Sequence, residues 1–154
     1  MERSDSGGET AMEFLGREQG NYPGLSNSGG APVSWAAEYV PDRATVVVNG
    51  SGRLRFEDMR GIAKGATDLL QKNKASRVLL DCSEAVLDVK VVDVFYLPEC
   101  YETVGVPRNA RIAFIVPKTR QPSGICEFYE TVCRNKGYLC RLFNTQESAM
   151  QWLR

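Results

Sequence analysis

The sequence contains no histidine. This absence excludes Ser-His-Asp and Cys-His catalysis, together with zinc sites that need imidazole ligands. The five cysteines include no Cys-x-x-Cys pair, so the closely spaced thiolates of zinc ribbons are missing as well. We therefore expect no metal site. The cysteines are interpreted as small core residues of a protein in a reducing compartment.

Long apolar runs are also lacking. The longest ones span only a few residues, far fewer than the ~18 that a transmembrane helix requires. The first residues do not show the basic start and apolar stretch of a signal peptide. These patterns predict that no helix spans a membrane and that the protein is cytoplasmic.

Neither sign of charge is in excess, because 19 Lys and Arg residues balance 19 Asp and Glu residues. A nucleic-acid-binding domain normally carries surplus positive charge to neutralise phosphates, so nucleic acid is not an expected partner. The 154 residues, 43% of them hydrophobic, suit one domain with a packed core.

Residues 1–33 differ in kind from the rest of the chain. They hold seven of the 14 glycines, few aliphatic side chains and no sustained periodicity. Such a segment cannot bury enough apolar surface to offset the entropy lost on ordering. The sequence predicts a disordered Gly/Ser-rich tail over 1–33 and one α/β domain over 34–154.

Strand and helix patterns alternate from residue 34 onward. The predicted strands cover residues 35–40, 44–48, 78–81, 112–116 and 138–143. The predicted helices begin near residues 56, 89, 122 and 146, and Gly50-Ser51-Gly52 is interpreted as a break after the second strand. The order β-β-α-β-α-β-α-β-α predicts a mostly parallel sheet of four or five strands with an antiparallel hairpin at one edge.

Three local signals refine the helices. Asp88 is expected to cap the second helix, and Thr145 is expected to cap the last one. Pro98 removes a hydrogen bond inside the second helix, which predicts either a kink or two short helices.

Two parts of the chain resemble a known family. Residues 46–52 and 56–81 resemble the opening of a STAS domain, the small α/β fold of anti-sigma-factor antagonists and sulfate-transporter tails. The closing half resembles the SpoIIAA-like branch, often grouped with SEC14-type lipid-binding domains, at residues 111–116, 135–137, 141–143 and 149–153. The similarity covers residues 36–154. It implies a sheet of four or five strands with helices, no cofactor and usually no catalysis.

The chain departs from this family at one functional position. In the antagonist proteins, an Asp-Ser pair at the start of the second main helix carries the serine that a kinase phosphorylates. This sequence has Asp88-Val89-Lys90 at the matching place. Valine and lysine cannot accept a phosphoryl group in that way, so the usual phospho-acceptor serine is predicted to be absent. Ser83 lies nearby, in the loop predicted to follow the strand that ends at Asp81.

Three carboxylates are candidates for chemistry. Asp81 is expected at the carboxyl end of a strand, where α/β sheets bind ligands, while Asp88 and Asp93 follow it in the sequence. No nucleophile or oxyanion donor accompanies them. The protein is therefore predicted not to be an enzyme, and an Asp-based enzyme is kept as a remote alternative.

Two further groups suit a bound ligand. Lys118, Arg120 and Ser123 lie in a loop that either binds an anionic head group or is simply solvated. Phe95 and Tyr101, with Tyr96 and Val104, lie on the proline-containing helix. They either border a groove or belong to an ordinary core.

The sequence thus yields a set of candidate residues and two functions. The candidate ligand- or partner-binding residues are Asp81, Ser83, Asp88, Lys90, Phe95, Tyr101, Lys118, Arg120 and Ser123. The predicted function is a non-catalytic regulatory or protein-interaction module, with a second copy of the chain among the candidate partners. The alternative is a carrier or sensor of a small amphiphilic or anionic ligand.

Overall fold

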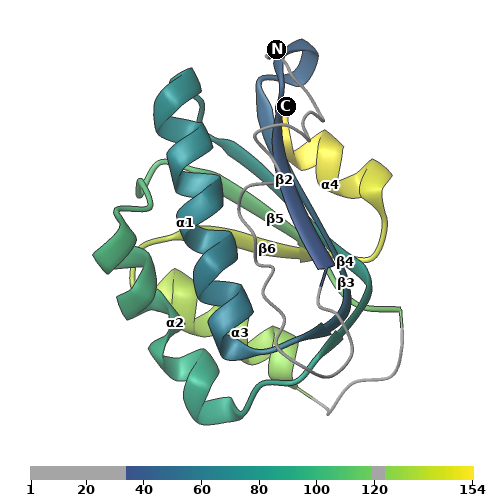
Figure 1. The fold of residues 1–154 in the computed structure, drawn as a ribbon, viewed down its shortest axis with the longest axis vertical. Helices are drawn as coiled ribbons and strands as arrows, with labels where there is room; N and C mark the ends of the chain where they lie inside the picture. Colours follow the sequence, from purple (N-terminus) through teal and green to yellow (C-terminus); the bar gives the residue numbers. More distant parts are fainter. Residues whose placement is uncertain (1–33, 119–123) are drawn as a thin grey trace.

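The structure, a computed structural model, describes residues 34–118 and 124–154. The tail predicted over residues 1–33 lies outside this range. The elements follow in the order β2 (Ser34–Val40), a 3-10 turn (Pro41–Arg43), β3 (Thr45–Leu54), α1 (Phe56–Asn73), β4 (Arg77–Leu87), α2 (Val91–Val104), β5 (Arg111–Ile115), α3 (Ile125–Asn135), β6 (Leu139–Phe143) and α4 (Gln146–Leu153). Figure 1 shows this arrangement. The predicted order of strands and helices is confirmed.

The five strands form one sheet in the order β2-β3-β4-β5-β6. The β2–β3 hairpin is antiparallel, and the other three pairs are parallel. Each parallel pair is joined through a helix, as a crossover connection requires. The predicted mixed sheet with an antiparallel edge is therefore confirmed.

Strands β3 and β4 are longer than predicted. The Gly50-Ser51-Gly52 segment lies inside β3, where the register with β4 shifts between Asn49 and Ser51, so its interpretation as a break is wrong. A Cβ at Gly50 would lie 3.1 Å from Leu54 Cδ1, and Gly52 has a φ of +71°. The glycines therefore permit an irregularity within the strand rather than ending it.

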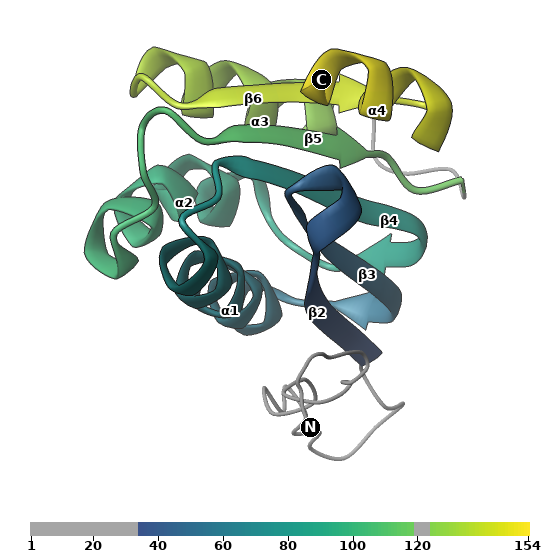
Figure 2. The same cartoon turned by 90° about the horizontal axis from the view of Figure 1, so that it is seen from above.

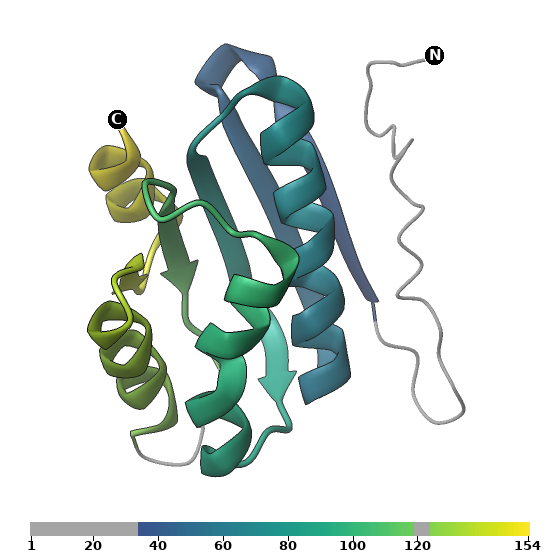
Figure 3. The ribbon, with the colours of Figure 1, turned by 90° about the vertical axis from the view of Figure 1, so that its left-hand side faces the viewer.

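The helices cover the two faces of the sheet unequally. Helices α1 and α2 lie on the face opposite α4 (Figure 2). Helices α1, α2 and α3 enclose the main core with one face of the sheet, while α4 packs on the other face through Ala149 and Leu153. Figure 3 shows α2 in the middle of the three-helix layer, between α1 and α3. Only one side of α2 therefore faces the core.

The chain continues as a single helix through Pro98, so the alternative of two short helices is wrong. Pro98 itself is buried against the core, which offsets the hydrogen bond that it removes. Thr145 caps α4 as predicted, because its side chain accepts from the Ser148 backbone N–H at 3.2 Å. Within the described residues, every helix is too short or too polar to cross a membrane.

Candidate protein-binding surface

Helix α2 carries apolar side chains on its solvent side. Val91, Val92, Phe95 and Tyr96 are 59%, 54%, 54% and 47% exposed, and we call these four residues the α2 outer face. The rings of Phe95 and Tyr96 meet edge to face with their centroids 5.3 Å apart. Most of the large exposed apolar side chains of the described residues are thus concentrated on two turns of one helix.

The opposite side of α2 is part of the core. Val94, Leu97 and Tyr101 are buried there. A surface helix normally has one apolar and one polar side, and a helix that is apolar all round is normally covered. Of the described residues, those of the sheet, α1 and α3 cover α2 on its inner side and flanks, and none covers the side that carries Phe95 and Tyr96. On the described part of the surface, the α2 outer face is therefore the region where most of the large apolar side chains remain exposed to solvent.

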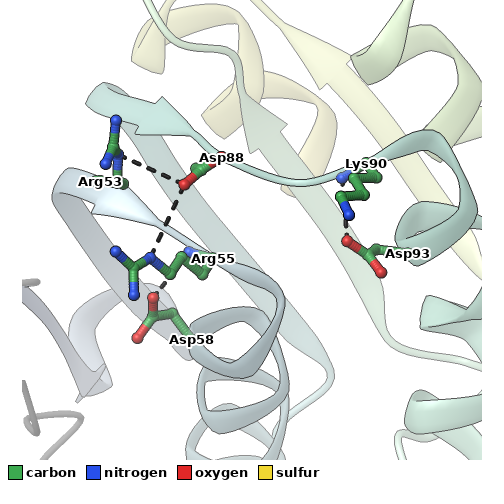
Figure 4. A network of polar contacts seen from close by, with 6 residues as sticks. All are labelled: Arg53, Arg55, Asp58, Asp88, Lys90 and Asp93. Carbon is green, nitrogen blue, oxygen red and sulfur yellow. Dashed lines mark hydrogen bonds and ion pairs between the residues drawn. The ribbon is translucent and has the colours of Figure 1, made fainter. Parts of the chain in front are cut away.

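Residues at the start of α2 fix where this face lies. Lys90 is the N-cap residue, and its backbone N–H donates to Asp93 Oδ2 at 3.0 Å. The predicted cap, Asp88, has another role. Its carboxylate lies 3.5 Å from Arg53 Nε and 3.8 Å from Arg55 Nε, as Figure 4 shows. The prediction was wrong because α2 begins later, leaving Asp88 beside the ends of β3 and β4.

The backbone strengthens this corner. The Asp88 N–H donates to the Leu54 carbonyl oxygen at 2.8 Å, which joins the end of β4 to the end of β3. Across the corner, the Arg55 N–H donates to Asp58 Oδ2 at 2.8 Å and so starts α1 (Figure 4). The Arg53, Arg55 and Asp88 side chains are about half-exposed, so water screens their ion pairs and their net contribution to stability is small.

Asp81 and Ser83 lie inside β4 rather than at its end, which corrects their predicted positions. Asp81 Oδ1 accepts from the Ser83 backbone N–H at 2.9 Å, and the Ser83 carbonyl accepts from the Lys118 N–H at 3.0 Å. The strand continues because residues 84–87 pair with residues 51–54 of β3. Ser83 is therefore a half-buried strand residue and does not lie in a loop.

The carboxylates of Asp81 and Asp88 do not converge. Residues 82–87 of the strand separate them, which corresponds to roughly 20 Å along the chain, and each has its own hydrogen-bond or ion-pair partners. In the described parts of the chain, no group of three or more His, Cys, Asp or Glu side chains is placed to hold a metal. The geometry thus offers no shared site for an Asp-based reaction.

Phe95 and Tyr101 are not on the same face of α2, so they do not border a common groove, and of the two alternatives that the sequence left open Tyr101 follows the ordinary core. Phe95 points to solvent, whereas Tyr101 is buried and its hydroxyl lies 2.8 Å from the Tyr129 hydroxyl. One apolar cavity of about 20 Å³ borders Val94 and Leu97, and another of about 30 Å³ borders Tyr101. Each has room for about one water molecule, so an amphiphile enters only if the helices separate.

The predicted anion-binding loop is described only in part. The Lys118 Nζ is exposed and lies 2.9 Å from Glu84 Oε2, and this hydrogen bond raises the pKa of the lysine. Arg120 and Ser123 lie outside the described residues. In the described part, the lysine is therefore paired with a carboxylate of β4.

The buried hydroxyls of Tyr101 and Tyr129 and the Cys133 thiol are held in their neutral forms. Burial raises the pKa of the Tyr101 and Tyr129 hydroxyls well above its ordinary value. The hydrogen bond that the Cys133 thiol donates to Cys140, together with burial, raises the pKa of Cys133. Because the thiolate is the nucleophilic form of cysteine, Cys133 is a core residue and not a reactive one.

Solved structures of low sequence identity share the arrangement of the chain. An uncharacterised protein of the DUF3478 family with a SpoIIAA-like fold, from Shewanella loihica PV-4, is 16% identical and matches with a TM-score of 0.51; the match covers 84% of this chain and 99% of that one. The chain has a SpoIIAA-like fold. This confirms the fold implied by the family resemblance in the sequence.

Two SpoIIAA structures also match. The unphosphorylated anti-sigma factor antagonist is 19% identical with a TM-score of 0.43, over 79% of this chain and 98% of that one. The phosphorylated cell fate determinant from Bacillus is 15% identical with a TM-score of 0.44, over 79% of this chain and 100% of that one. No family model matches the sequence, and no curated protein does. The roles of side chains on this SpoIIAA-like fold therefore have to come from their own geometry.

The sequence analysis named Phe95 and Tyr96 of the α2 outer face but grouped them with the buried Tyr101, and it did not single out Val91 and Val92. A usable signal was present, because the segment from Val91 to Leu97 contains only one charged residue. A helix of that composition has no polar side to turn toward water.

Proposed function

We propose that this chain is a non-catalytic protein-interaction module of the STAS/SpoIIAA-like type, and that the α2 outer face is its binding surface. The observation that carries the proposal is the group of four half-exposed apolar side chains on one side of α2. Protein interfaces concentrate aromatic side chains at their centres, and Phe95 and Tyr96 provide two of them. The SpoIIAA-like fold is consistent with this role.

Protein binding is preferred to ligand carriage for a geometric reason. The apolar surface that is already open is convex and lies on a helix, which suits a partner's side chains. The cavities beside the core have volumes of only about 20 and 30 Å³, which is too little for an amphiphile. A carrier would have to separate α2 from its neighbours before binding, whereas a protein partner needs no such opening.

We propose in addition that phosphate at the start of α2 does not switch this surface. The N-cap position is occupied by Lys90, and the residues before it are Asp88 and Val89. Ser83, the nearby hydroxyl, lies within β4, where both its N–H and its carbonyl are hydrogen-bonded. A kinase would therefore have to open the strand to reach it.

Site-specific cross-linking tests the binding surface. A photoreactive amino acid is placed at Val92 in the full chain, with Leu139 on β6 as the control position of similar exposure, 46%. We expect cross-links to a distinct protein from position 92 alone. That protein is then purified, and its affinity is measured by calorimetry for the wild type, Phe95→Asp and Leu139→Asp.

The expected result is a loss of at least tenfold in affinity for Phe95→Asp, because the substitution places a charge in the centre of an apolar contact, while Leu139→Asp binds normally. Equal cross-linking from both positions would contradict the proposal. So would an affinity that Phe95→Asp leaves unchanged in a folded protein.

A further inference from the structure

One end of the molecule is strongly basic. The parallel strands begin at this end and helices α1, α2 and α3 finish there, because each of these helices leads into the next parallel strand. The segments that meet at this end are residues 41–44, 72–77, 102–111 and 134–139, and they contain eight Lys or Arg but only two Asp or Glu. Since the whole chain is neutral, this end carries a local excess of positive charge.

Six of these cations form a band across the sheet. Arg77 and Arg111 are paired neighbours at the starts of β4 and β5. Arg77 Nη1 donates to the Arg43 carbonyl oxygen at 3.3 Å, which ties the band to the turn between β2 and β3. Neighbouring strands lie ~4.8 Å apart, so the band from this turn to the start of β6 is roughly 15–20 Å wide. We call these six residues the basic end: Arg43, Lys74, Arg77, Arg111, Arg134 and Lys136.

The charges of the basic end lack carboxylate partners. None of the six residues forms an ion pair with another described residue. The nearby carboxylate of Glu102 is already paired with Arg108 at 2.8 Å. The carbonyl groups at the ends of α1 and α3 offset the cations beside them, but Arg43 and Arg77 lie next to strand ends, which have no such dipole. Part of the positive charge is therefore available to a partner.

An exposed leucine lies in the same band. Leu139 begins β6, is the register partner of Arg111 and is 46% exposed. No large aromatic side chain of the described residues is exposed beside it, since Phe95 and Tyr96 lie in the first turns of α2. Surfaces that bind single-stranded nucleic acid offer aromatic rings to the bases, and those that read a duplex insert a helix or ribbon into a groove. Cations around an aliphatic side chain suit the headgroup region of a bilayer instead.

We propose that the basic end docks onto a membrane surface that contains anionic lipids. The headgroups supply the negative charge that the described residues do not, and Leu139 enters the boundary between headgroups and acyl chains. The proposal is independent of the proposed function, because α2 begins at the opposite end of the sheet and its outer face stays clear of the bilayer. A protein bound to that face is then held close to the membrane.

Vesicle binding tests the proposal. The full chain is centrifuged with vesicles of phosphatidylcholine alone, or of phosphatidylcholine with about 30% phosphatidylserine. At about 0.1 M salt we expect binding to the anionic vesicles alone, and release at about 0.5 M because salt screens the attraction. The triple variant Arg43→Gln, Arg134→Gln, Lys136→Gln removes three cations. Each cation strengthens binding to an anionic surface roughly fivefold, so we expect this variant to bind about a hundredfold more weakly.

A matched triple variant is the first control. Arg53→Gln, Arg60→Gln, Lys90→Gln removes the same numbers of Arg and Lys from exposed positions at the opposite end of the sheet. These positions lie farther from the bilayer than the Debye length of about 10 Å, so we expect this variant to bind like the wild type.

A second pair of variants tests the leucine. Leu139→Ala should weaken binding to the anionic vesicles severalfold, whereas Val86→Ala, at a position of β4 with a similar exposure of 41%, should leave it unchanged. Circular dichroism verifies the fold of every variant.

Three results would overturn membrane docking. The first is a wild-type protein that binds neither kind of vesicle, and the second is an equal loss of binding in the two triple variants. The third is binding of a DNA duplex or a single-stranded RNA at the same salt concentration as tightly as the anionic vesicles, which would assign the basic end to nucleic acid. The cross-linking experiment from Val92 decides the proposed function separately, because the vesicle assay contains no partner protein.

Discussion

Helices α1 and α2 lie side by side on the same face of the sheet, yet their solvent sides differ in chemistry. The exposed side of α1 carries Arg60, Lys64 and Lys72, whereas the exposed side of α2 carries valines and aromatic rings. Their buried sides are alike, since both contribute apolar residues to the main core. Core packing therefore accounts for the apolar residues of α1, but for only those apolar residues of α2 that face the core. The apolar side chains on the other half of α2 have no such explanation in the core, and the proposed binding surface would account for them.

The strongest test of this comparison is to truncate the two sides of α2 separately. Leu97→Ala removes a buried side chain and is expected to lower the free energy of unfolding by about 2–5 kcal/mol. Phe95→Ala removes a half-exposed ring and is expected to cost less than about 1 kcal/mol. Urea denaturation measures both. Equal losses would show that Phe95 is a core residue, and the distinction between the two sides would fail.

The second prediction concerns a thiol on the buried side of the helix layer formed by α1, α2 and α3. Burial on α3 raises the pKa of the Cys126 thiol from 9.0 to about 11. The unfolded chain therefore releases this proton first as the pH rises, so stability is full below pH 9 and falls between pH 9 and 11.

We expect Cys126→Ala to show a shallower loss of stability than the wild type across this window. Urea denaturation at a series of pH values gives the two slopes. Equal slopes for the wild type and Cys126→Ala would mean that burial in the helix layer does not raise the pKa of the Cys126 thiol.

The smallest effect is expected on the outer side of α1. Lys64 Nζ lies 3.2 Å from Asp68 Oδ2 one turn away, and both groups are largely solvated. Lys64→Ala should lower the free energy of unfolding by about 0.3–0.5 kcal/mol and less in high salt. A loss above about 1 kcal/mol, or one that high salt leaves unchanged, would contradict the solvent-exposed character of this side of α1.

Much of the architecture follows from local sequence. The β-branched run Thr45-Val46-Val47-Val48 predicts a strand, and the helical spacing of Ile125, Tyr129 and Val132 predicts α3. Apolar periodicity reports these elements because each must bury one side. Thr145 was identifiable as a cap for a similar reason, since its contact with Ser148 is local in sequence.

The errors lie where distant residues decide the outcome. Gly50-Ser51-Gly52 stays in a strand because residues of β4 pair with it across the sheet. Asp88 pairs with Arg53 and Arg55 because β3 and β4 end together at one corner. No local pattern contains such pairings, and so the sequence reading ended both strands too early.

For this protein, the sequence by itself determined the order of the elements, the mixed sheet and the lack of histidine-based chemistry. Only the tertiary structure decided which side of α2 faces water. Helical spacing shows that Phe95 and Tyr101 lie on one helix, but the position of the sheet and of α1 and α3 around that helix determines which ring is buried. The α2 outer face is what remains exposed once those neighbours have packed, because burial is a property of the assembled layers and not of any single segment.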